Sequence, residues 1–167
     1  MSADLAPGQG WPEPVERVSA FLRAAAAEAR LEEFAVGTPT ASAAAEAVGC
    51  ELNRIVKSIV LQADDRAIVA LVPGDRRADA AKVAKAVGAS GARTAGPEEV
   101  EAATGFPPGA VAPFPLRRVD RVLVERTLLV HEMVWIGAGS DRHMAGLAPA
   151  ELVRLARAEP VDIVEDD

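Results

Sequence analysis

The sequence predicts a mixed α/β domain in which a mixed, largely antiparallel sheet is flanked by helices. Amphipathic helical segments and short apolar strands are intermixed along the chain, but they do not follow a regular βαβ repeat. Two apolar runs, 55–62 and 67–72, are joined by the polar turn 63–66, which predicts an antiparallel hairpin. The 167 residues fit one ordinary domain. We assign residues 13–164 to it, after a poorly ordered lead-in at 1–12.

Two helices are predicted before the hairpin. The first carries an apolar face whose helical spacing extends as far as Ala29. The short run 33–36 is expected to be a strand. Thr38 is expected to cap the second helix, with Pro39 at its first position and Gly49 just past its end.

Glycine and proline delimit the elements predicted after the hairpin. Gly88 and Gly105 each follow an amphipathic segment and therefore end helices, and Pro97 suits the first position of the second of them. The expected elements are helices at 80–87 and 97–104, strands at 121–130 and 133–136, a break at 137–140, a strand at 142–147, a helix at 150–156 and an edge strand at 161–163.

Composition excludes several classes of protein. The net charge of −7 argues against broad coating of nucleic acid, although small basic groups at 76–85 and 117–126 leave a local phosphate contact open. With four Phe, two Trp and no Tyr, the chain has little material for stacking bases. It has one cysteine, no run of about 20 apolar residues and no signal-peptide pattern, so we expect a cytoplasmic protein without a membrane span.

Lys57 is unusual because it places a cation inside an apolar strand. Alternate side chains of a strand share a face, so Lys57 lies with Ile55, Ile59 and Leu61. An ammonium on that face must reach water at the strand end or point into a cleft that holds a negative group. The alternation alone leaves both the structural and the functional role open.

The loop 106–115 is the second candidate for a functional element. Its four prolines exclude a helix or a central strand, because they fix backbone angles and remove donors. Gly109 permits close approach by a ligand. Such a loop either arranges backbone groups around a small polar group or serves only as a rigid turn.

The polar segment with Ser140, Asp141 and His143 invites comparison with a catalytic triad. Triad members seldom come from within four residues, so a turn between strands is the favoured interpretation. The imidazole and thiol groups of Cys50, His131 and His143 lack the paired spacing of metal ligands. With no glycine-rich phosphate loop either, we expect neither a metal nor a cofactor.

Five motifs in order resemble the YbaK/prolyl-tRNA synthetase editing-domain family, over about residues 15–157. They are 38–40 with 44–49 and 55–60, then 71–77, 97–100, 109–113, and 134–140 followed by His143. The resemblance implies a barrel-like mixed sheet with flanking helices. It also implies hydrolysis of amino acids wrongly attached to tRNA, often the tRNA for proline.

The resemblance also implies roles for particular residues. Lys57 matches the family's functional lysine, expected to contact the phosphate or ribose of the tRNA acceptor end. The loop from Gly109 to Pro113 matches the G-x-x-x-P signature, whose backbone positions the aminoacyl group and the attacking water. The catalytic positions implied are Lys57, Gly109 and Pro113, and the substrate-binding positions are Ser58, Ala110, Val111, Ala112, Gly139, Ser140 and His143.

The expected function is therefore that of a free-standing trans-editing deacylase. It would hydrolyse the ester of a small noncognate amino acid (Ala, Cys, Ser or Thr) on tRNA, with the tRNA for proline as the expected substrate. The expected partners are the aminoacyl-tRNA acceptor end and an aminoacyl-tRNA synthetase. Two alternatives stay open, a noncatalytic adaptor that binds tRNA or a synthetase, and a hydrolase of another aminoacyl ester.

Overall fold

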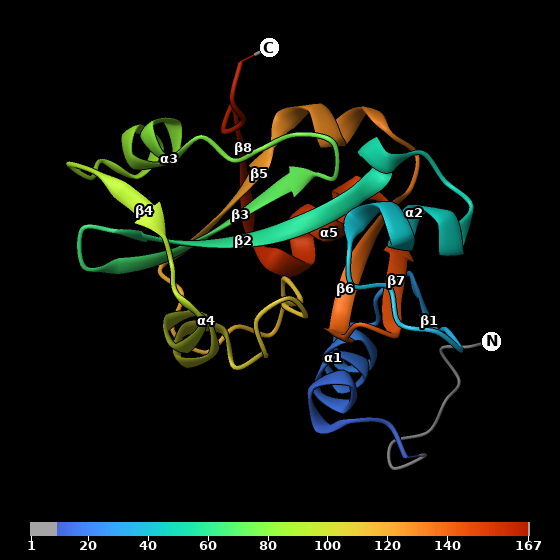
Figure 1. Ribbon diagram of the computed structural model, residues 1–167. Coiled ribbons are helices and arrows are strands. Elements are labelled where there is room, and N and C mark those ends of the chain that lie inside the picture. The colour runs from blue at the N-terminus through green and yellow to red at the C-terminus, as the bar shows by residue number, and fades with distance from the viewer. Residues whose placement is uncertain (1–9, 167) are drawn as a thin grey trace.

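The computed structural model describes residues 10–166, in which helices surround one mixed sheet (Figure 1). The helices are α1 (Glu13–Ala24), α2 (Ala41–Val48), α3 (Ala80–Val87), α4 (Pro97–Thr104) and α5 (Pro149–Ala156), with short 3-10 turns η2 (Leu52–Arg54) and η3 (Arg126–Val130). The strands are β1 (Ala29–Glu33), β2 (Ile55–Ala63), β3 (Arg66–Pro73), β4 (Ala92–Thr94), β5 (Arg121–Glu125), β6 (Val134–Ser140), β7 (His143–Leu147) and β8 (Ala158–Val161).

The sheet has eight strands in the order β1-β7-β6-β2-β3-β5-β8, with β4 paired to β2 outside this path. The pairs β1–β7, β6–β7, β2–β3 and β2–β4 are antiparallel. The pairs β2–β6, β3–β5 and β5–β8 are parallel. The predicted fold class is therefore confirmed, and so is the hairpin, in which β2 and β3 pair from Val56↔Pro73 to Ala63↔Arg66.

The sheet changes direction between β2 and β6. In Figure 1, β6 and β7 run steeply across the line of β2 and β3. One apolar cluster lies under α1 and α5 and includes Val56 and Val60, while a second lies under α3 and includes Leu61. A third packs α2 against Ile55 and the end of the β6–β7 hairpin. Burial on both faces explains why β2 and β3 are apolar almost throughout.

The N-terminal boundaries differ from the prediction. Helix α1 ends at Ala24, and Ala26 adopts a left-handed φ of 49°. The chain then enters β1, which pairs with β7 from Ala29↔Leu147 onward, so the strand predicted at 33–36 starts earlier and ends at Glu33. The strand was predicted too far along the chain because only Leu31 of the five β1 residues is buried.

The cap of α2 is Thr40 and not Thr38. The Thr40 side chain accepts a hydrogen bond from Ala43 N at 3.1 Å. The N–H and the hydroxyl of Thr38 both donate to the Asp141 carbonyl, which ties this residue to the β6–β7 turn. The chain therefore becomes helical only at Ala41.

Several boundaries in the second half also differ. The strand predicted at 121–130 ends at Glu125, where that side chain accepts from Thr127 N and starts η3. Strand β6 continues through the predicted break at 137–140, with a register shift between Gly137 and Ser140. Strand β4 was not predicted, and the edge strand expected at 161–163 forms at Ala158–Val161. The helix ends predicted at Gly88 and Gly105 are confirmed.

Most of the predicted lead-in, residues 1–12, lies outside the described part of the chain. Among residues 10–166, no helix is both long and apolar enough to cross a membrane.

Candidate active site

A cavity of about 240 Å³ opens where one edge of β2 lacks a neighbouring strand. Strand β6 pairs only with Ile55 and Val56, and β4 pairs only from Leu61 onward. Between these two pairings, residues 57–59 line the cavity together with the 109–111 loop and the β6–β7 turn. The divergence of β6 from β2 thus creates the space. It also leaves the backbone of residues 57–59 without a neighbouring strand on that edge of β2.

Lys57 lies in this cavity and is half-buried. Its Nζ donates a hydrogen bond to the Arg76 carbonyl at 2.6 Å. Burial lowers the pKa of Lys57, the charge of Arg77 lowers it further, and Asp75 acts in the opposite direction. An ammonium has three donors, so two remain for a ligand. The ammonium is held by a backbone carbonyl at the cavity and does not extend freely into water.

The proline-rich loop supplies backbone groups to the opposite side of the cavity. Gly109 has a left-handed φ of 83°, and a Cβ added there would meet nothing within 4 Å, so open space lies beside it. Ala110 N is engaged by the Pro107 carbonyl at 3.0 Å. Within residues 10–166, the N–H groups of Gly109 and Val111 donate to no acceptor. Both residues line the cavity, which makes their N–H groups candidates for stabilising an oxyanion.

Ser140 and His143 form a polar pair at the third side of the cavity. Ser140 Oγ lies 2.6 Å from His143 Nδ1 and also accepts a hydrogen bond from Arg142 N at 3.0 Å. Because Oγ already accepts from Arg142, its own hydrogen is available to donate to Nδ1, which places the imidazole proton on Nε2. That nitrogen lies 3.4 Å from Glu33 Oε2.

The surroundings of the His143 ring favour its neutral form. Burial lowers its pKa from the ordinary value, although the nearby Glu33 carboxylate opposes this shift. The ring is only 2% exposed and packs edge-on against Trp11, with centroids 5.1 Å apart. Glu33 and Trp11 were not identified from the sequence, because they belong to segments remote from His143 that meet it only through the β1–β7 pairing and the packing before α1.

Seven of the ten predicted site residues line this one cavity, namely Lys57, Ser58, Gly109, Ala110, Val111, Ser140 and His143. Ala112 is fully buried in the core. Pro113 lines a different cavity, beside Phe21 and Phe114. The Ser58 Oγ atom is buried and has no hydrogen-bond partner within the described residues, so this residue meets the cavity through other atoms.

Gly139 is not part of the cavity wall. Its φ is 102°, and a Cβ added there would lie 2.8–2.9 Å from backbone atoms of Pro14 and Val15. The position serves the close packing of β6 against the start of α1. Gly137, which was not predicted, lines the cavity instead, and Met144 and the α2 residue Ala44 add apolar surface. In a regular strand Gly137 and Gly139 would share one face. The bulge between Gly137 and Ser140 breaks this alternation, so the sequence could not show which of the two glycines lines the cavity.

Residues 35–155 match the family of aminoacyl-tRNA editing domains. The chain belongs to this editing-domain family. Over 144 residues it is 33% identical to the proline–tRNA ligase of Xanthomonas oryzae pv. oryzae (strain MAFF 311018), a match that covers 84% of this chain and 26% of that protein. The proline–tRNA ligase of Nitratidesulfovibrio vulgaris (strain DP4) is 34% identical over 134 residues, with coverage of 80% and 23%. The chain thus spans about a quarter of the length of these curated relatives.

The fold of this editing domain is shared with a solved structure described as "a putative trans-editing enzyme for prolyl tRNA synthetase". The two superimpose with a TM-score of 0.87 and 33% sequence identity, over 94% of this chain and 100% of the other. The predicted family and its mixed α/β fold are therefore confirmed.

Replacing Ser140 with alanine tests whether this hydroxyl orients His143 or acts as a nucleophile. Because Ser140 binds Nδ1 and a backbone N–H of its own turn, we expect Ser140→Ala to slow deacylation of aminoacyl-tRNA only about three- to tenfold, the equivalent of one hydrogen bond. The measurement is single-turnover release of the amino acid. Ser90→Ala, which removes a hydroxyl bound to Asp64, is the matched control. A loss of about 10⁴-fold would instead indicate a nucleophile.

Proposed function

We propose that this chain hydrolyses the ester between a small noncognate amino acid and the terminal adenosine of tRNA, acting in trans in the cytoplasm. The proposed amino acids are alanine, cysteine, serine and threonine, and the proposed carrier is the tRNA for proline. The observation that carries the proposal is one small cavity that joins Lys57, unpaired loop N–H groups and the Ser140–His143 pair. Membership of the editing-domain family supports the reaction type.

The chemistry fits a site without a protein nucleophile. Aminoacyl esters are already activated, and the neighbouring ribose hydroxyl can orient or deprotonate a water molecule. The protein therefore has to position the ester and stabilise the negative charge that develops on its carbonyl oxygen. In this proposal Lys57 binds the nucleotide as a cation and not as a base, and the N–H groups of Gly109 and Val111 face the developing oxyanion.

The size of the cavity supports a small amino acid. Its volume of about 240 Å³ lies below the ~300–1,000 Å³ typical of pockets for drug-sized ligands. Ala44, Ile55 and Met144 supply apolar surface for a short side chain. One methylene changes binding by only about 1–3 kcal/mol, so a synthetase cannot fully reject a smaller amino acid by binding alone. A second hydrolytic site that admits only small side chains removes this error.

The relatives support the tRNA for proline as the carrier of the noncognate amino acid. Both curated relatives are named as proline–tRNA ligases, and the similar solved structure is described as acting for prolyl tRNA synthetase. We therefore propose that an aminoacyl-tRNA synthetase is a partner of this chain and supplies its mischarged tRNA.

A panel of mischarged tRNAs tests the proposal. We expect purified protein to release at least one of alanine, cysteine, serine and threonine from the tRNA for proline at least tenfold faster than it releases proline, because an editing site must spare the correctly charged tRNA. The measurement is the time course of labelled amino acid that remains esterified. The same amino acid on the tRNA for alanine controls for recognition of the tRNA. Absence of release from every substrate, combined with retained tRNA binding, would favour the adaptor.

A further inference from the structure

The segment between β3 and α3, residues 74–79, holds the acceptor of the Lys57 ammonium. In Figure 1 it leaves the end of β3 and turns back above that strand to α3. Its Arg76 carbonyl accepts the hydrogen bond from Lys57 Nζ at 2.6 Å. The position of this segment therefore sets the position of the cation.

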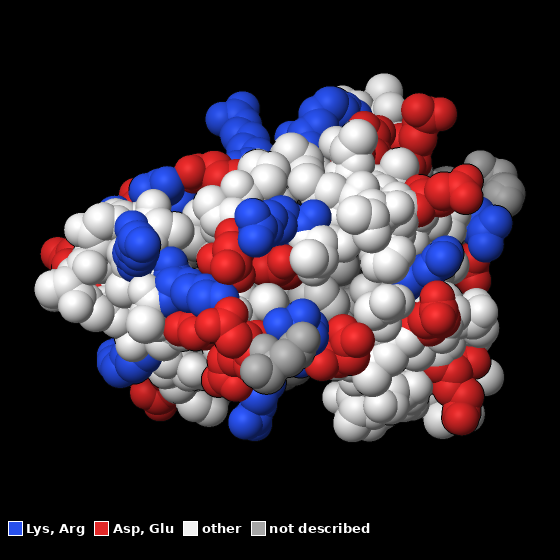
Figure 2. All heavy atoms as spheres, turned by 90° about the horizontal axis from the view of Figure 1, so that it is seen from above, with Lys and Arg blue, Asp and Glu red and all other residues white. Residues whose placement is uncertain are grey.

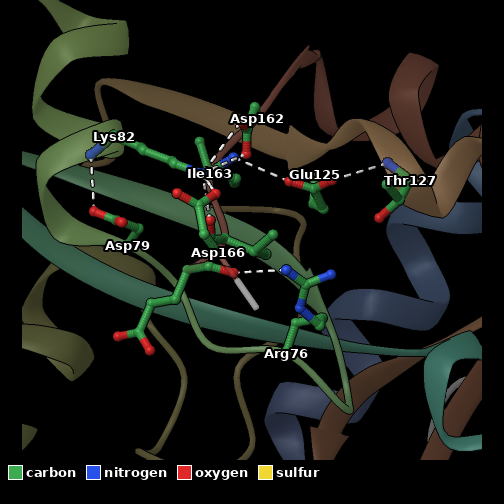
Figure 3. A network of polar contacts seen from close by, with 10 residues as sticks. Arg76, Asp79, Lys82, Glu125, Thr127, Asp162, Ile163 and Asp166 are labelled. Atoms are coloured by element: carbon green, nitrogen blue, oxygen red, sulfur yellow. Dashed lines mark hydrogen bonds and ion pairs between the residues drawn. The ribbon is translucent and has the colours of Figure 1, made fainter.

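The C-terminal segment fixes residues 74–79 by backbone pairing. Glu165 N donates to the Arg77 carbonyl and Asp79 N donates to the Ile163 carbonyl, both at 2.8 Å. Figure 3 shows how Ile163 is itself held, since its N–H donates to the buried carboxylate of Glu125 at 3.0 Å. The segment beside Lys57 is thus part of an ordered backbone ladder and not a free loop.

Most basic groups of this region already have partners. Lys82 Nζ contacts Asp162 at 3.0 Å and Asp166 at 2.8 Å. The Arg76 guanidinium donates to the Glu165 carbonyl at 2.6 Å (Figure 3). The Arg77 side chain differs, because it is exposed and makes no hydrogen bond or ion pair within residues 10–166. Its backbone is fixed while its guanidinium is available.

The charges around Lys57 suit one anionic group. Arg77 directly follows Arg76, whose carbonyl accepts the hydrogen bond from Lys57 Nζ at 2.6 Å, so the Arg77 backbone lies beside the ammonium. The charge of Arg77 also lowers the pKa of Lys57, and Asp75 opposes that effect. Lys57 and the exposed Arg77 thus offer two cationic groups on neighbouring segments, enough donors for the oxygens of one phosphodiester. On the face seen in Figure 2, basic and acidic side chains are interleaved, so that face offers no broad basic surface for a longer polyanion.

We propose that Arg77 is a second phosphate-binding residue, which acts with Lys57 to hold a phosphodiester of the tRNA acceptor end next to the Lys57 ammonium. This inference rests on the proposed function, because it names the part of that substrate that the rim of the site binds. A guanidinium offers a planar pair of donors that suits phosphate oxygens, whereas Lys57 contributes a point charge.

Arg77→Ala tests the inference through binding as well as hydrolysis. We expect the dissociation constant for an oligonucleotide ending in the acceptor sequence to rise about tenfold, since one charge-assisted contact is lost. The slope of log affinity against log salt should become shallower by about 0.7, the value for one phosphate contact on a single strand. The KM for mischarged tRNA should rise by a similar factor, with kcat unchanged. Arg77→Lys should restore part of the affinity.

Lys85→Ala is the matched control, because it also removes one positive charge but lies in the last turn of α3. We expect it to leave oligonucleotide binding unchanged. A second comparison uses a 3′-aminoacyl adenosine without phosphate, whose hydrolysis Arg77→Ala should not alter. Equal oligonucleotide binding by Arg77→Ala and wild type, or an equal loss on the phosphate-free ester, would overturn the inference. If wild type hydrolyses no ester, the proposed function fails, while the binding comparison still decides the role of Arg77.

Discussion

Replacing Lys57 with alanine is expected to lower the rate of deacylation of mischarged tRNA about 100-fold while the protein stays folded. Two of the ammonium donors are free for substrate, and two charge-assisted contacts at ~1.5 kcal/mol each account for a loss of this size. Stability should change little, because the lost hydrogen bond to Arg76 is offset by relief of the cost of burying a charge, which also lowers the pKa of Lys57. Single-turnover deacylation and thermal unfolding measure the two effects.

Two further variants make the Lys57 experiment decisive. Lys57→Arg keeps a cation and should retain more activity than Lys57→Ala, although its longer fork cannot reproduce the contact with the Arg76 carbonyl. Lys85→Ala removes an exposed charge from α3 and should deacylate at the wild-type rate. If Lys57→Ala keeps full activity, the assignment of the substrate cation to this residue is wrong.

Lys57 also illustrates how far the sequence alone reaches. Strand alternation identified a cation on an apolar face, and the family resemblance gave it a role. Neither could identify the Arg76 carbonyl as its acceptor, because that carbonyl is placed by pairing between residues 76–79 and a C-terminal segment far along the chain. Contacts between distant segments carry no local signal, and the same reason hid the contact of Glu33 with His143.

Local structure was predictable where burial and capping agreed. The β2–β3 hairpin is apolar almost throughout, and glycine in a left-handed conformation ends α3 and α4, so these elements formed as expected. Element boundaries were predicted wrongly where contacts with a distant segment outweighed the local preference of the sequence. Strand β1 has one buried residue and forms because β7 offers it an edge. Thr38 lost the role of cap to Thr40 because the Asp141 carbonyl engages it.

Gly139→Ala is expected to destabilise the protein by about 2–4 kcal/mol, a large share of the stability of an ordinary domain. The φ of 102° is strained for alanine, and the new Cβ would lie 2.8–2.9 Å from the backbone of Pro14 and Val15. Backbone atoms cannot rotate away as a flexible side chain does, so α1 would have to shift from β6. Urea unfolding monitored by circular dichroism measures the change in the free energy of unfolding.

Gly137→Ala provides the comparison, because this glycine lies on the same strand but lines the cavity. A Cβ there would lie 3.3 Å from the Val111 carbonyl, a tight contact with the loop that flanks the site. We therefore expect Gly137→Ala to lower deacylation about tenfold by displacing this loop, at a cost in stability below about 1 kcal/mol. If Gly139→Ala instead keeps wild-type stability and loses activity, Gly139 belongs to the substrate site after all, and the packing of α1 against β6 does not explain the glycine.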